Sequence, residues 1–163
     1  MLLLCVSILA GCQSIGNVLG SKKILTKHLL FIPRQGSLHV TWEARHLTIA
    51  FKGRVSQNIL TMNGRIDINS GGNQQFTLLD RLIVDIYLTD SAGNVLGKHT
   101  FYSTEKLPVH ATTPRTFRHR FDLPKGTSHI AFGYDGTARE GGSKALLKKR
   151  NAIEHRFQHS PFR

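Results

Sequence analysis

Cysteine, acidic residues and long apolar runs are scarce in this sequence. Its 163 residues include two cysteines, too few for a disulfide scaffold or for a zinc site built from four thiolates. The one candidate membrane segment, Met1 to Gly11, is far shorter than the roughly 20 residues of a membrane-spanning helix. P-loop, dinucleotide-binding, HExxH and GxSxG motifs are all absent. We therefore assign no catalytic residue, cofactor or metal ligand, and expect a protein that is not an enzyme.

Histidine, in contrast, is abundant, but no local metal motif results. No two histidines form an HxH pair, and the closest two, His155 and His159, are four positions apart. On a helix that pair would supply two ligands, whereas zinc sites take at least three from the protein. A periplasmic metal-binding protein or hydrolase, with a site assembled from separate strands, is the alternative that these residues leave open. The full set is His28, His39, His46, His99, His110, His119, His129, His155 and His159.

The N-terminal segment carries the most specific motif. Residues 1–11 are apolar and uncharged, which is typical of the hydrophobic region of a secretory signal. The four residues Leu9-Ala10-Gly11-Cys12 resemble the lipobox of bacterial lipoproteins, in which an aliphatic and two small residues precede the lipidated cysteine. The resemblance implies that residues 1–11 are a signal peptide and that a diacylglyceryl thioether forms on Cys12. It also implies that the new amino group is acylated, with a chain such as palmitate.

A lipid anchor of this kind predicts the location of the protein. Two or three acyl chains hold a protein to a membrane more firmly than one, at about 0.8 kcal/mol per buried CH2. Cys5 would leave with the signal, so the mature chain would have no free thiol. In enterobacteria-like lipoproteins an aspartate after the lipidated cysteine favours the inner membrane, and here Gln13 and Ser14 follow it. The resemblance thus implies an outer-membrane anchor facing the periplasm, with residues 12–21 as a lipidated tether.

Basic residues outnumber acidic ones by 22 to 10, and their distribution is uneven. Residues 13–66 carry a net charge of +7, residues 67–136 are neutral and residues 137–163 carry +5. A basic surface can bind anionic lipid, an acidic glycan, an acidic protein or nucleic acid. Nucleic acid is disfavoured, because most phenylalanines fall on inward-facing positions and leave few rings to stack on bases.

Residues 22–136 alternate between apolar and polar positions, the period of half-buried β-strands. The clearest case is the segment 81–89, followed by its predicted partner 95–103. Between them Asp90, Gly93 and Asn94 favour a hairpin turn. Seven or eight short strands of this kind predict an all-β domain, an antiparallel β-sandwich of immunoglobulin-like character. A small closed β-barrel is the alternative.

Residues 137–163 lose this alternation and form either a basic tail or a short helix. Ser143 can cap a helix that starts at Lys144. The apolar side of that helix would consist of Leu146, Leu147, Ile153 and Phe157, with basic residues around it. Such a segment could lie on an anionic membrane or dock into a groove of a partner.

Six basic residues are predicted to contact an anion or a partner. Arg118 and Arg120 share one face of a strand, so their guanidinium groups project together, and Arg115 precedes them. The other three stand in the C-terminal segment: Lys148, Lys149 and Arg150. The sequence therefore predicts a membrane-anchored periplasmic lipoprotein, a non-catalytic binding or assembly module of an envelope complex. Its partners would be the membrane and an envelope protein, and a carrier for an anionic lipid or glycan is a further alternative.

Overall fold

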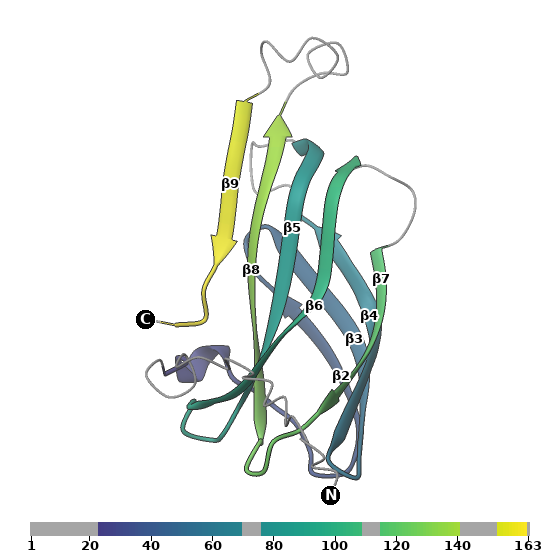
Figure 1. Ribbon diagram of the computed structural model, residues 1–163, viewed down its shortest axis with the longest axis vertical. Coiled ribbons are helices and arrows are strands. Elements are labelled where there is room, and N and C mark those ends of the chain that lie inside the picture. The colour runs from purple at the N-terminus through teal and green to yellow at the C-terminus, as the bar shows by residue number, and fades with distance from the viewer. Residues whose placement is uncertain (1–22, 70–75, 109–114, 141–152, 163) are drawn as a thin grey trace, which may run out of the picture.

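The computed structural model describes residues 23–69, 76–108, 115–140 and 153–162 (Figure 1). Two antiparallel sheets pack face to face, which confirms the predicted all-β sandwich. The sheets do not close on each other, so the barrel alternative is wrong. Within the described ranges the only helical element is the 3-10 turn η1 (Thr26–His28), and no helix there is long and apolar enough to cross a membrane.

One sheet has four strands in the order β2-β3-β4-β7. Each neighbouring pair runs antiparallel and in continuous register. The strands are β2 (Gly36–Glu43), β3 (Leu47–Ser56), β4 (Ile59–Ile68) and β7 (Arg115–Asp122). The strands β2, β3 and β4, which are consecutive in the chain, therefore lie side by side. Constant immunoglobulin domains also have two packed sheets, but the strand order of their four-stranded sheet is ABED, which differs from this one.

The second sheet has five strands, with the order β1-β8-β5-β6 and with β9 also paired to β8. Both β1 and β9 lie along the same edge of β8, because β1 pairs at Ile130 and β9 pairs from Tyr134 onward. The strands are β1 (Leu30–Phe31), β5 (Phe76–Thr89), β6 (Val95–Pro108), β8 (His129–Glu140) and β9 (Ile153–His159).

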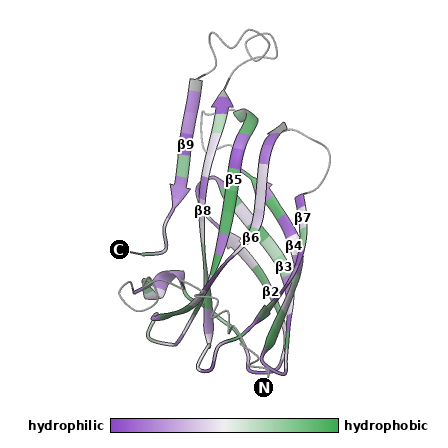
Figure 2. Ribbon diagram, in the orientation of Figure 1, coloured by the Kyte–Doolittle hydropathy of each residue, from purple (hydrophilic) through white to green (hydrophobic). Residues whose placement is uncertain are grey.

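The core lies between the two sheets and follows from the alternation in the sequence. Every second side chain of β3 is buried, and the central strand β5 is predominantly hydrophobic (Figure 2). Facing sheets stack about 10 Å apart, so inward side chains from both layers meet in one apolar interior. Its largest fully buried members are Phe76, Phe132, Leu47, Ile49, Leu60, Met62, Ile66, Leu79, Leu82, Ile86 and Leu88, whereas Ile24 packs in a separate cluster with Val95 and Ala131.

The predicted hairpin between β5 and β6 is present. The Asp90 carboxylate accepts hydrogen bonds from the backbone N–H groups of Ala92 and Asn94, each at 2.9 Å. These bonds, together with one from the Asn94 amide, hold the pKa of Asp90 below its ordinary value. The turn also fastens the start of the described chain, since the Ile24 N–H donates to the Gly93 carbonyl at 3.0 Å.

The C-terminal segment corrects one expectation. The helix predicted from Lys144 does not extend through Phe157, because Ile153–His159 is the strand β9. The segment alternates with the period of a strand: Phe157 is buried, while its neighbours Arg156 and Gln158 are exposed. Pairing with the open edge of β8 gives the backbone groups of this segment hydrogen-bond partners. An isolated helix of the same length would be only marginally stable. Residues 141–152, with Lys148, Lys149 and Arg150, lie outside the described residues, as do residues 1–22 with the predicted signal peptide, lipobox and tether.

Candidate functional site: a basic sheet face

The outer face of the four-stranded sheet gathers basic side chains from all four strands. Alternation directs the odd-numbered residues of β3 and β7, and the even-numbered residues of β2 and β4, into the core, and it directs the others outward. We call these outward basic side chains the basic face: Lys52, Arg54, Arg65, Arg118, Arg120 and His39, all exposed.

The strand register places these residues in three rows across the sheet. Side chains in one row are direct cross-strand neighbours, about 4.8 Å apart from strand to strand. The rows contain five Lys or Arg residues and no carboxylate. They are Thr41, Ala50, Arg65 and Thr116; His39, Lys52, Asn63 and Arg118; and Ser37, Arg54, Thr61 and Arg120.

Four of the cations form the corners of a rectangle around β4. Lys52 and Arg54 stand on β3, and their row partners Arg118 and Arg120 stand on β7, two strands away. The rectangle measures about 10 Å across the strands and about 7 Å along them. The shorter side chains of Asn63 and Thr61 occupy its middle on β4, so longer cationic side chains flank a lower strip of polar groups.

None of the ion pairs in the described part of the chain involves these four cations. The fifth cation, Arg65, pairs with Asp67 at 3.0 Å. The outward acids of this sheet lie beyond the three rows, with Glu43 and Asp67 in one flanking row. A compact group of like charges without internal counterions costs free energy, and binding an anion would relieve that repulsion.

The outer face of the other sheet is arranged differently, because four of its cations pair with aspartates. Lys98 pairs with Asp85 at 2.9 Å, and the hydrogen bond to that carboxylate raises the pKa of Lys98. Asp135 similarly lies between Arg81 and Arg156, and Asp80 pairs with Arg139. The unpaired charge of the described sheets is therefore concentrated on one side of the sandwich.

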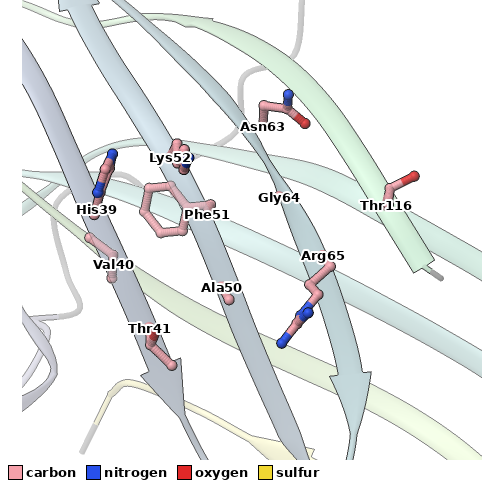
Figure 3. Close-up of a pocket in the computed structure, with 10 residues that line it drawn as sticks. All are labelled: His39, Val40, Thr41, Ala50, Phe51, Lys52, Asn63, Gly64, Arg65 and Thr116. Atoms are coloured by element: carbon pink, nitrogen blue, oxygen red, sulfur yellow. The ribbon is translucent and has the colours of Figure 1, made fainter.

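A shallow depression of about 480 Å³ adjoins the rectangle (Figure 3). Its floor is the small side chain of Ala50, which has Thr41 and Arg65 as cross-strand neighbours. The longer side chains of His39 and Lys52 stand in the next row and form a wall. The depression thus results from one small residue surrounded by larger polar ones on a flat sheet.

Gly64 on β4 allows the strands below this depression to approach closely. On the inner face it lies between the cross-strand aromatic residues Phe51 and Phe117. A Cβ atom at this position would stand 2.6 Å from the Phe51 Cβ and would also overlap the Ala50 carbonyl. Only glycine fits here without moving β3 away from β4.

The predicted contact residues divide between the two faces of β7. Arg118 and Arg120 project outward together, as the alternation indicated. Arg115 points to the opposite face and is half-buried, since it has the same parity as the inward Phe117. Its charge acts on Tyr102, where it partly offsets the increase in the phenol pKa caused by burial. Arg115 is therefore not part of the basic face.

Sequence reasoning missed Lys52, Arg54 and Arg65 as members of the same surface. The pattern Lys52-x-Arg54 repeats the spacing of Arg118-x-Arg120, and this repetition was the available indication. The proximity of the two pairs could not be inferred, because it depends on β4 lying between β3 and β7.

Histidines do meet in the structure, at the start of the described chain and its end. The imidazoles of His28 and His159 lie 5.0 Å apart, centroid to centroid. Burial lowers the pKa of both, and nearby positive charge, from Lys27 for His28 and from His28 for His159, lowers it further. Among the described residues, no three His, Cys, Asp or Glu side chains are placed to hold a metal ion.

Comparisons with protein-family models, with curated proteins and with solved structures found no match for this chain. The assignment of a function therefore depends on the lipobox-like motif of residues 9–12 and on the geometry of the basic face.

Proposed function

We propose that this chain is a membrane-anchored, non-catalytic binding module of the bacterial cell envelope, which holds an anionic partner on its basic face. The observation that carries the proposal is the rectangle formed by Lys52, Arg54, Arg118 and Arg120, whose charges have no counterion within the described ranges. Exposed guanidinium groups are well suited to carboxylate, phosphate and sulfate groups, which they bind through two parallel hydrogen bonds.

The anchor supplies the second half of the proposal. The resemblance of residues 9–12 to a lipobox supports lipidation of Cys12. The described chain begins beside the β5–β6 turn, where Lys23 bridges to Asn94. Residues 12–21 would therefore connect that end of the sandwich to the membrane, over at most about 35 Å of extended chain. The basic face lies on a side of the sandwich, so a tether at one end leaves it open to a partner.

Intact mass tests the anchor. The protein extracted from membranes is expected to have the mass of residues 12–163 plus a diacylglyceryl and an acyl group. Cys12→Ala is expected to remain unprocessed and to lose that lipid, whereas the control Cys5→Ala is expected to keep it. A wild-type chain that begins at Met1 without lipid would exclude a lipoprotein.

Polyanion binding tests the basic face. The full-length chain in non-ionic detergent is titrated with polyglutamate and with polygalacturonate. Arg118→Gln combined with Arg120→Gln is expected to weaken binding of at least one polymer roughly 25-fold, about fivefold for each cation removed. The matched control is Arg34→Gln combined with Lys125→Gln, which removes the same charge from exposed residues in loops at the end of the sandwich. Equal losses in both double variants would show that only net charge matters and would exclude a defined binding face.

A further inference from the structure

We infer that the anionic ligand of the basic face is an acidic polysaccharide, with a sugar residue over Ala50 and an acidic group at Lys52. This assignment rests on the proposed function and names the chemical class of the partner. It follows from the absence of large apolar side chains on the basic face and from the depression and cations that the face contains.

The face lacks the apolar anchors of a protein interface. Stable protein–protein interfaces are enriched in aromatic residues, Met and Arg, and a few Trp, Tyr and Arg side chains in well-packed pockets provide most of the binding energy. Among the described residues the one exposed large hydrophobic side chain is Phe31, which is 67% exposed. Phe31 belongs to β1, in the other sheet, so the three rows of the basic face offer arginines but no large apolar side chain to fill a pocket of a protein partner.

The same rows hold no exposed Phe, Tyr or Trp ring, which makes nucleobases a poor fit, because single-stranded nucleic acid is held by stacking as well as by charge. A partner recognised by charge and hydrogen bonding alone is a hydrophilic polymer with regularly spaced acidic groups. Acidic polysaccharides have this chemistry.

The depression provides the shape that a sugar ring needs. Its volume of about 480 Å³ is within the range of small-ligand sites, which is about 300–1,000 Å³. The methyl group of Ala50 forms a small apolar floor for the C–H face of a ring. Thr41, Asn63 and Thr116 line the depression, and rotation of their hydroxyl and amide groups would let them exchange hydrogen bonds with sugar hydroxyls.

Lys52 and Asn63 connect the depression to the rectangle. Both line the depression, and both stand in the row that ends at Arg118. A polymer that places one ring over Ala50 would therefore pass Lys52 and continue between the cations of β3 and β7. Three strand spacings, about 15 Å, separate β2 from β7, so the face accommodates a short run of sugar residues.

A substitution that fills the depression without changing charge separates this inference from the proposed function. Ala50→Leu replaces the methyl group with an isobutyl group where the ring would sit, and it leaves every cation in place. In the full-length chain in detergent, we expect it to weaken polygalacturonate binding by about tenfold or more. Binding of polyglutamate, which has no ring to accommodate, is expected to change little.

The matched control is Ser56→Leu, which makes a similar change on the same face of β3, outside the depression. It is expected to bind polygalacturonate as the wild type does. Thermal unfolding of both variants shows that each is folded, and neutral dextran measures binding that does not need charge. Wild-type binding of polygalacturonate is also expected to weaken steeply with salt.

Three outcomes would overturn the assignment. If polyglutamate binds through the basic face as tightly as polygalacturonate, and Ala50→Leu affects both equally, the partner is an acidic protein segment and the proposed function stands. If phosphatidylglycerol micelles displace polygalacturonate and their own binding is tighter, the face belongs to lipid headgroups. If the Arg118/Arg120 double variant binds every polyanion as its control does, the proposed function fails as well.

Discussion

The imidazole of His159 on β9 lies edge-on against the indole of Trp42 on β2, with 5.3 Å between ring centroids and 71° between ring planes. Trp42 is buried, and Phe132 and Tyr134 of β8 also contact it. The last strand of the chain therefore packs against the first long strand and covers one open side of the sandwich. This contact makes the C-terminal strand part of the core.

Truncating Phe157, the buried side chain that packs β9 against the core, is expected to destabilise the whole domain. Phe157 is 3% exposed and stacks on Phe76 with 5.5 Å between centroids. Phe157→Ala leaves a cavity in the core, and we expect the free energy of unfolding to fall by about 3–5 kcal/mol. Chemical denaturation measures this loss. Gln158→Ala, at the neighbouring exposed position, is the control and should stay within about 0.5 kcal/mol. Similar stabilities for the two variants would show that β9 is not needed for the fold.

The stability of the fold is expected to rise with pH through the titration of His159. Burial, and then the charges of His28 and Lys27, lower its pKa below the ordinary 6.5. Between the two values the unfolded chain binds more protons than the folded one, so unfolding becomes easier as pH falls below 6.5. The contribution of His159 to the free energy of unfolding is therefore complete above pH 6.5, and it is lost as pH falls toward the pKa of His159 in the folded state.

Denaturation midpoints measured between about pH 5 and 8 test this pH dependence. His159→Phe keeps a ring against Trp42 and removes the titrating group, so it is expected to flatten the profile. It also removes the Nε2 atom, which is buried without a hydrogen-bond partner. His39→Gln changes an exposed histidine on the basic face and should leave the slope as it is. An unchanged slope in His159→Phe would assign the pH dependence to other groups.

The β5–β6 turn depends on glycine at position 93. Gly93 has φ +84°, and a Cβ atom there would stand 2.5 Å from the Ile24 carbonyl oxygen. Gly93→Ala is expected to lower the free energy of unfolding by more than about 1 kcal/mol. It should also speed hydrogen exchange at the Ile24 amide, which donates to Gly93. Ser91→Ala, at an exposed position of the same turn, should change neither property.

Gly64→Ala tests whether close packing of β3 and β4 in the core is needed for the shape of the basic face. The added methyl group would force apart β3 and β4, which carry Ala50 and Asn63 of the depression. We expect a loss of stability of about 1–3 kcal/mol, typical of overpacking, and weaker polygalacturonate binding in the fraction that folds. The control Thr61→Ala shortens an outward side chain of β4 and should leave the stability nearly unchanged. Wild-type stability in Gly64→Ala would mean that the two strands can separate at no cost.

The alternation of apolar and polar residues was sufficient to predict the two-layer fold. A strand exposes alternate residues to opposite faces, so a period of two marks the buried face of each strand before any partner is known. The same reasoning placed Arg118 and Arg120 outward and identified the turn at Asp90. It failed for Ile153–His159, where two positions of the strand were read as part of a helical stripe. A segment of seven residues matches both periods, and only the open edge of β8 decides between them.

The sequence by itself therefore determined which side chains of each strand are inward, where the main hairpin turns, and the lipobox-like motif at Cys12. Only the tertiary structure decided which strands are neighbours. Lys52 and Arg118 are far apart in the chain, and Asn63 brings them into one row because β4 pairs with both β3 and β7. Local periodicity carries no information about such long-range pairing, which depends on how the buried faces pack together. The basic face, and with it the proposed function, results from that pairing.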